Sequence, residues 1–211
     1  MKKLFVIPII LGITAAISLS IVLVSEDSPE LESQTIYDGG FAYYDIETIQ
    51  NTLAEKSITV SRPAAVTDHT IGQYCTYFEK GLPRTVEYCT TTSVIGSEGN
   101  PFGNINMGGD TTSPILAIAN LETSTLESDK EEVVSVIEVM IETLVCDCWE
   151  EVKADDDVAS ISAWVDAVHN FYYESGERGI KSQVDDLTDA KIFLEITPKE
   201  NSILQTLIII K

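Results

Sequence analysis

Residues 4–24, LFVIPIILGITAAISLSIVLV, form a largely apolar segment without a charged side chain, and this segment sets the first limit on the fold. Its 21 residues match the roughly 20 that a helix needs to cross the hydrocarbon core of a bilayer. A cleaved signal peptide is the alternative, with residues 18–20 as its best cleavage site. Lys2 and Lys3 precede the segment, so the positive-inside rule predicts a cytoplasmic N-terminus and an extracytoplasmic remainder.

The apolar segment divides the chain into three predicted parts. Residues 1–24 are the membrane anchor or signal peptide, and residues 25–40 form an acidic tether without periodicity. Residues 41–211 are of a length that suits a single extracytoplasmic domain. We therefore predict a cell-membrane protein that contacts the bilayer through residues 4–24, or a secreted protein if the segment is cleaved.

The charge balance limits the partners that the domain can bind. The chain carries 34 acidic and 13 basic residues, for a formal net charge of −21. Nucleic acids are excluded because phosphate binding requires clustered Lys and Arg. Nucleotides are excluded because the glycine-rich stretch 96–113 contains no Lys or Arg and no GKS or GKT motif follows it. The acidity itself either attracts cations or a basic partner, or simply keeps the protein soluble.

Apolar periodicity predicts three helices in the domain. A short one begins near Asp45, and two long ones begin near Ser128 and Ala154. The first long helix carries an apolar stripe at helical spacing that continues through Cys148, so we expect this helix to extend to Trp149. The second long helix is expected to stop near Gly176.

Five segments are typical of β-strands, because they are rich in β-branched and aromatic residues and are bounded by turn signals. Two pairs of them form hairpins, and the glycine-rich stretch 96–113 is expected to be a loop. The strands are residues 70–78, 84–95, 114–121, 190–197 and 202–211. Together these elements predict an α+β domain in which two long helices cover a mainly antiparallel sheet of about five strands.

The four cysteines are expected to form disulfides, because the domain is predicted to be extracytoplasmic. Cys75 and Cys89 lie symmetrically about Leu82 in the turn of the first hairpin, which makes a Cys75–Cys89 bridge the first choice. The alternative joins both of these cysteines to Cys146 and Cys148, since sequence alone does not fix connectivity.

The Cys146–Asp147–Cys148 motif offers a different chemistry. Thiolate and imidazole ligands suit copper or zinc, so Cys146, Cys148 and His169 are candidate metal ligands, and the two thiols are a candidate redox pair. Residues two apart on a helix point about 200° apart. Both sites therefore require the helix to end by about Val145, and the following WEEV sequence argues against that.

The glycine-rich stretch contains oxygen-bearing side chains that are candidate calcium ligands, namely those of Asn104, Asn106 and Asp110. The sequence contains no G-x-S-x-G or H-E-x-x-H motif and only two histidines, so we do not expect an enzyme. We predict a membrane-anchored, non-catalytic interaction or accessory protein of the cell envelope that binds a protein partner and needs no cofactor. The alternatives are a copper- or zinc-binding or thiol redox protein, and a calcium-binding surface module.

Overall fold

A computed structural model describes residues 41–79, 81–153, 158–184 and 187–211. The predicted anchor at residues 4–24 and the predicted tether at residues 25–40 lie outside these described residues. So does the predicted start of the second long helix at residues 154–157. Within the described ranges, no helix is both long and apolar enough to cross a membrane.

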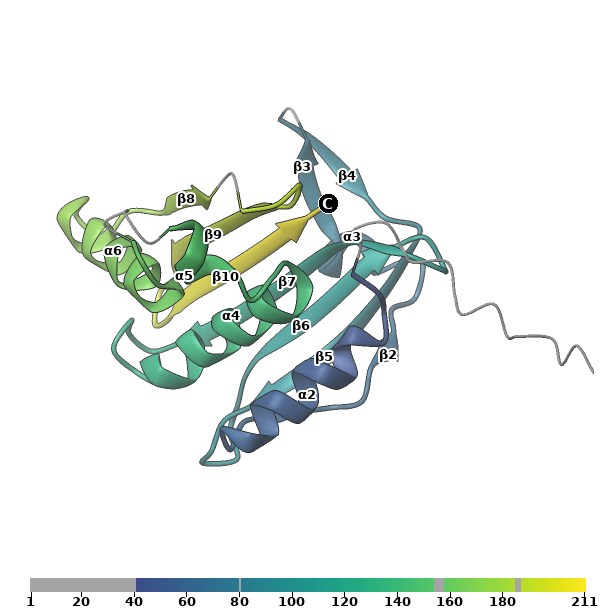
Figure 1. Ribbon diagram of the computed structural model, residues 1–211, viewed down its shortest axis with the longest axis horizontal. Helices are drawn as coiled ribbons and strands as arrows, with labels where there is room; N and C mark the ends of the chain where they lie inside the picture. The colour runs from purple at the N-terminus through teal and green to yellow at the C-terminus, as the bar shows by residue number, and fades with distance from the viewer. Residues whose placement is uncertain (1–40, 80, 154–157, 185–186) are drawn as a thin grey trace, which may run out of the picture. The chain divides into compact units, whose positions relative to one another are not determined.

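One antiparallel sheet of eight strands dominates the described chain (Figure 1). The strand order is β1-β5-β6-β7-β10-β9-β8, and β2 pairs with β5 beside β1. Two three-stranded meanders, β5-β6-β7 and β8-β9-β10, therefore meet through β7 and β10. The strands are β1 (Thr59–Val60), β2 (Ala64–Ala65), β5 (Tyr88–Ile95), β6 (Pro101–Gly109), β7 (Pro114–Thr123), β8 (Ile180–Val184), β9 (Lys191–Pro198) and β10 (Ile203–Ile210).

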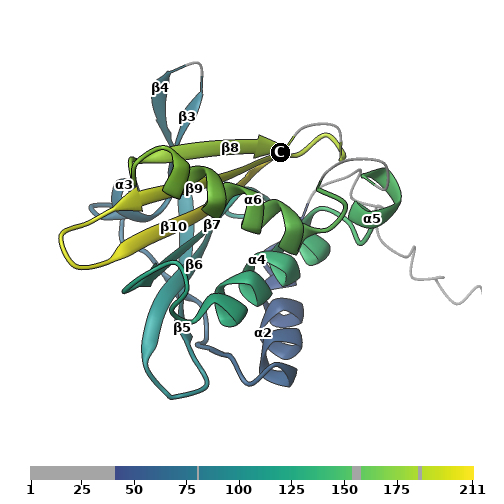
Figure 2. The same ribbon diagram turned by 90° about the vertical axis from the view of Figure 1, so that its left-hand side faces the viewer.

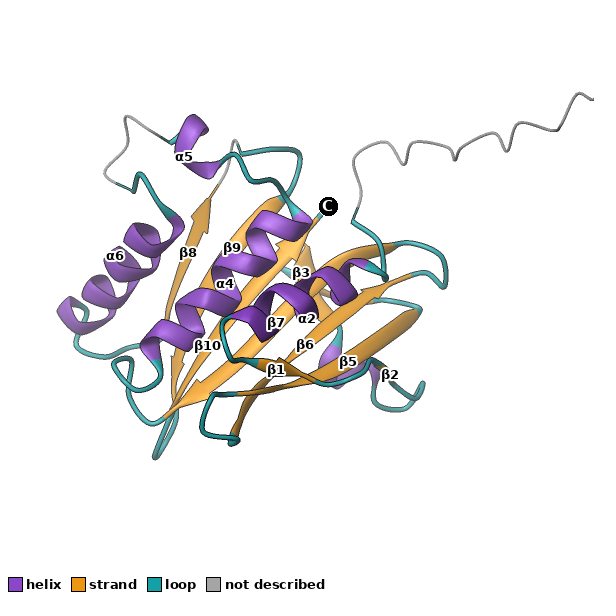
Figure 3. Ribbon diagram, turned by 60° about the horizontal axis from the view of Figure 1, so that its bottom comes forward, coloured by secondary structure: helices purple, strands orange, loops and turns teal. Residues whose placement is uncertain are grey.

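Three helices cover one face of this sheet (Figures 2 and 3). They are α2 (Asp45–Glu55), α4 (Lys130–Leu144) and α6 (Ile161–Glu174). Their apolar stripes pack on alternate residues of the strands, such as Ala119, Leu194 and Leu207, which are fully buried. The main hydrophobic core therefore lies between the helices and the sheet.

The opposite face of the sheet is covered only in part. The short helix α3 (Ile71–Tyr74) is followed by a separate two-stranded hairpin of β3 (Thr76–Glu79) and β4 (Leu82–Thr85). A small second cluster of buried side chains lies on this face. Its members come from α3, from the segment around the hairpin and from the sheet: Ile71, Cys75, Val86, Cys89, Leu116 and Ile118.

The predicted fold class is wrong, because the described chain is mostly sheet. Eight strands form the main sheet in place of about five, and the five helices are short in place of two long ones. The stretch 96–113, predicted to be a loop, contains the nine-residue strand β6. The predicted strand 70–78 begins instead as α3, and its hairpin partner is β4 rather than the strand that contains Cys89.

Several local predictions are confirmed. The helix predicted from Asp45 is α2, which buries Ile46, Ile49 and Leu53. Helix α6 ends at Glu174, and Gly176 follows with φ of +77°, a conformation that favours glycine at a helix C-terminus. The last strand, β10, is central, because it lies between β7 and β9.

Candidate functional site

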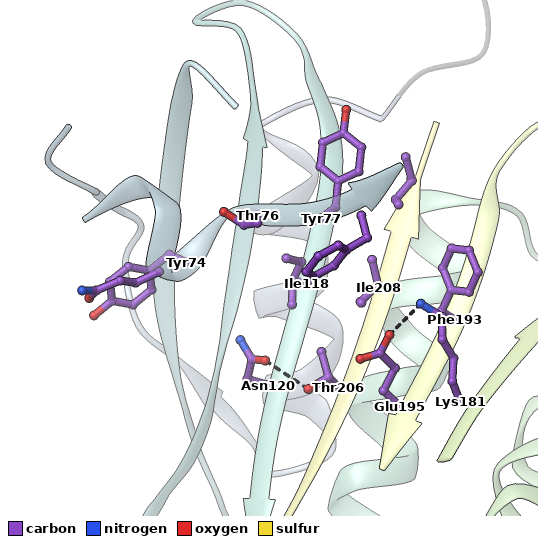
Figure 4. A pocket seen from close by; sticks show the side chains of 13 residues that line it. Tyr74, Thr76, Tyr77, Ile118, Asn120, Lys181, Phe193, Glu195, Thr206 and Ile208 are labelled. Carbon is purple, nitrogen blue, oxygen red and sulfur yellow. Dashed lines mark hydrogen bonds and ion pairs between the residues drawn. The ribbon is translucent and has the colours of Figure 1, made fainter. Parts of the chain in front are cut away.

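A concave surface lies between the β3–β4 hairpin and the open face of the sheet (Figure 4). Two hollows of about 180 and 350 Å³ share four lining residues, so they adjoin and together make up this surface. We call it the hairpin groove, and the shared residues are Tyr77, Phe78, Phe193 and Ile210.

Strand alternation places the side chains of the groove. On β9, Ile192, Leu194 and Ile196 are fully buried against the helices, so Phe193 and Glu195 project from the opposite face. The antiparallel register then aligns side chains across neighbouring strands, and Phe193 lies opposite Ile208 of β10. Ile208 in turn lies opposite Ile118 of β7, so the floor of the groove is built by strands from both meanders.

Aromatic side chains of the hairpin form the wall of the groove. Tyr77 and Phe78 lie on β3, and Phe78 is 68% exposed although it is a large apolar residue. Leu82, across the hairpin turn, is 60% exposed. Exposed aromatic residues beside a concavity are typical of binding surfaces, because they bury a large area when a partner covers them.

A row of polar side chains crosses the floor at one end of the groove. Asn120 donates a hydrogen bond from Nδ2 to Asn104 Oδ1 at 3.2 Å, and Thr206 donates from Oγ1 to Asn120 Oδ1 at 3.2 Å. Further along the same row, Lys181 Nζ lies 2.6 Å from Glu195 Oε1. Figure 4 shows Asn120, Thr206, Glu195 and Lys181 facing the space beneath the hairpin. The row offers both donors and acceptors to a ligand.

The charge of the hairpin groove differs from that of the protein as a whole. Its lining includes three lysines and two acidic residues, whereas the chain has a net charge of −21. Lys181 also lies over the ring of Phe193, with Nζ 4.1 Å from the ring centroid. Partial burial lowers the pKa of Lys211, although the nearby carboxylates of Asp189 and Asp45 act in the opposite direction. The groove therefore favours apolar and acidic groups over basic ones.

The predicted Cys75–Cys89 disulfide is confirmed, but the geometric reason given for it is wrong. Cys89 lies on β5, opposite Gly108 of β6, whereas Cys75 follows α3 and precedes the hairpin. Both cysteines are fully buried, and their Cα atoms are 6.1 Å apart. The bond therefore ties α3 and the hairpin to the open face of the sheet, and it helps to position the groove.

The second disulfide joins Cys146 to Cys148, with Cα atoms 5.2 Å apart. The prediction that the helix continues through Trp149 is wrong, because α4 ends at Leu144 and a separate helix, α5 (Trp149–Val152), begins after the motif. Trp149 is nevertheless buried, and its Nε1 donates to the carbonyl of Val158 at 3.0 Å. The apolar stripe thus continues in the sequence because residues after the helix pack on the same core.

The candidate metal ligands do not converge. His169 is buried on α6, with Nε2 2.8 Å from Gln205 Oε1, and burial lowers its pKa. It lies eight residues beyond Ile161, or about 12 Å along α6. Ile161 lines a hollow together with Asp147, the residue between the two cysteines. Across the described ranges, no group of three or more His, Cys, Asp or Glu side chains could hold a metal ion. Copper or zinc binding stays a prediction.

The candidate calcium ligands are only partly brought together. Asn106 donates from Nδ2 to Asn104 Oδ1 at 2.8 Å, so these two residues are neighbours on the open face of the sheet. Asp110 lies beyond the end of β6, where its Oδ1 accepts from Thr112 and Ser113 at 2.7 Å. These hydrogen bonds, led by the Thr112 side chain, lower the pKa of Asp110. Calcium binding also stays a prediction.

Sequence reasoning missed the residues of the hairpin groove. The alternation of buried and open-face residues at 192–196 was readable, and it would have placed Phe193 and Glu195 on the face away from the helices. The pairing of β7 with β10 and the position of Tyr77 over the sheet carried no such signal. Comparison of the chain with known protein families, curated proteins and solved structures finds no match.

Proposed function

We propose that this protein is a non-catalytic binding protein of the cell envelope, held at the membrane by residues 4–24, which captures a protein partner in the hairpin groove. The observation that carries the proposal is the groove itself, with exposed aromatic residues at its wall and a polar row on its floor. The domain is placed outside the cytoplasm in this proposal, and two disulfides support that placement.

The shape of the groove favours an extended segment of polypeptide as the ligand. The two hollows adjoin beneath the hairpin, and their lining residues come from the neighbouring strands β7, β10, β9 and β8, so an extended occupant can lie across four strands. A chain segment can place apolar side chains against Phe78 and Phe193 while its backbone bonds to the polar row. Lys181 and Lys191 favour a segment that also carries carboxylates.

Site-specific photo-crosslinking in the native membrane tests this proposal. A photoreactive phenylalanine analogue at Phe78 is expected to give a discrete adduct with a partner protein. The same analogue at Phe171 is a matched control, because Phe171 is 58% exposed but lies on α6, on the other face of the sheet. An adduct whose yield is equal at both positions, or an adduct at Phe171 alone, would contradict a binding site in the groove.

A further inference from the structure

The Cys146–Cys148 disulfide does not act as a structural cross-link between elements. The two cysteines are two residues apart, so the bond closes a very small loop at the end of α4. In the chain-entropy model, the stabilisation from a disulfide rises with the length of the loop that it closes. The Cys75–Cys89 bond, with a sequence separation of 14, is the more stabilising of the two by this criterion.

The two disulfides also differ in their access to solvent. Cys75 and Cys89 are fully buried, whereas Cys146 and Cys148 are only partly buried and Asp147 between them is exposed. Thiol–disulfide exchange requires a thiolate to reach one sulfur of the bond, so solvent access decides which disulfide can react. In the folded protein, the Cys146–Cys148 bond is therefore the reactive one.

An acidic hollow of about 390 Å³ lies beside this disulfide. Asp147 of the motif lines it, together with four glutamates from α4 and α5: Glu138, Glu142, Glu150 and Glu151. Burial is the main cause that raises the pKa of Glu142, and the negative charge of Asp147 is the second. One lysine offsets this charge in part, since Lys56 Nζ lies 3.8 Å from Glu138 Oε2. A cationic segment fits this hollow better than an anionic one.

We propose that the Cys146–Cys148 disulfide is a thiol–disulfide exchange site whose substrate is a dithiol on a positively charged polypeptide segment. This site is separate from the hairpin groove and does not depend on the function proposed for it. Basic residues of the substrate would bind in the acidic hollow. They would also offset the repulsion between these acids and the thiolate that leaves when the disulfide opens.

The exchange between one substrate dithiol and one Cys146–Cys148 disulfide is balanced in electrons and protons. A substrate thiolate attacks one of the two sulfurs, forms a mixed disulfide and breaks the Cys146–Cys148 bond, and the released cysteine thiolate takes up a proton. The second substrate thiol loses its proton and attacks the substrate sulfur of the mixed disulfide. The second protein cysteine then leaves as a thiolate and is protonated. Two electrons and two protons pass from the substrate to the protein, so each chain oxidises one dithiol.

The test follows the opening of both disulfides in the folded, full-length chain. The oxidised protein is treated with cysteamine, a cationic thiol, or with 3-mercaptopropionate, an anionic one, at equal thiolate concentrations. Alkylation and peptide mass mapping then report each disulfide. We expect Cys146–Cys148 to open at least tenfold faster than Cys75–Cys89. Simultaneous opening of both bonds, or earlier opening of Cys75–Cys89, would overturn the proposal.

The charge selectivity provides the second readout. The ratio of the cysteamine rate to the mercaptopropionate rate is expected to fall on the order of tenfold in an E142Q/D147N/E150Q variant, because three charges of the acidic hollow are removed. The same ratio should fall in the unmodified protein when salt is raised from 10 mM to 1 M, which needs no variant. A ratio that responds neither to the substitutions nor to salt would overturn the assignment of a cationic substrate.

Discussion

We expect the two disulfides to contribute unequally to the stability of the domain. Replacing both Cys75 and Cys89 with Ala removes a bond with a sequence separation of 14. The chain-entropy model gives about 3 kcal/mol for a loop of about 15 residues. The same relation gives only about 1.5 kcal/mol for the loop between Cys146 and Cys148. The first double variant should therefore lose about twice as much unfolding free energy as the second.

Urea unfolding followed by tryptophan fluorescence measures both losses, because Trp149 and Trp164 are each 3% exposed and become solvated on unfolding. In thermal unfolding, a loss of about 3 kcal/mol lowers the midpoint by roughly 6–12 °C in a domain of this size, and the smaller loss by about half as much. Equal losses, or a larger loss in the Cys146 and Cys148 variant, would refute the view that only the Cys75–Cys89 bond is a structural cross-link.

Three further predictions concern individual side chains. Leu53→Ala on the fully buried face of α2 should cost about 2–5 kcal/mol in urea unfolding, whereas Phe171→Ala on the exposed face of α6 should cost less than about 1 kcal/mol. Burial is the largest cause that raises the pKa of Tyr43 to about 12, and the charges of Tyr88 and Asp110 add to it. The contribution of Tyr43 to the free energy of unfolding should therefore be complete below pH 10 and be lost between pH 10 and 12. A Tyr43→Phe variant that loses stability equally over this range would contradict that assignment. Burial lowers the pKa of His169, so its contribution is complete above pH 6.5 and is lost as the pH falls below that value. Lowering the pH from 6.5 to 5 should therefore reduce the free energy of unfolding of the unmodified protein more than that of a His169→Gln variant. Parallel curves of unfolding free energy against pH for the two proteins would contradict this.

The helices were the easiest part of the fold to predict from the sequence. The stripe of Ile46, Ile49 and Leu53 in α2 and the stop near Gly176 follow from local physics alone. The end of α4 was not predictable in this way, because Trp149 continues the apolar spacing although the chain has already left the helix. An apolar stripe in the sequence indicates which residues are buried in the core. It does not indicate whether the backbone between these residues is helical.

Strand β6 shows why composition misled the prediction of a loop. Its glycines serve close packing rather than flexibility, since a Cβ atom at Gly108 would lie 2.9 Å from the sulfur of Cys75. At Gly103, a Cβ atom would collide with the backbone carbonyl of Asn120 on the neighbouring strand. Glycine is therefore required at both positions by segments that are distant in the sequence. Without knowledge of these tertiary contacts, a glycine-rich stretch is predicted to be a loop.

The hairpin groove depends on pairings that no local pattern encodes. Thr206 lies beside Asn120 because β7 and β10 pair across more than 80 residues of sequence. Tyr77 covers this row because the Cys75–Cys89 bond ties the hairpin to the sheet. The alternation around Phe193 was visible in the sequence, but its meaning depended on knowing which face the helices cover.

The affinity of the partner identified by crosslinking, measured for two matched alanine variants, tests the proposed binding function most directly. Phe78→Ala removes an exposed aromatic residue from the wall of the groove, and Phe171→Ala removes a similarly exposed one from α6. We predict that Phe78→Ala weakens binding tenfold or more, as expected for an aromatic residue central to an interface, whereas Phe171→Ala changes it less than about twofold. Equal affinities of the two variants would contradict the hairpin groove as the binding site.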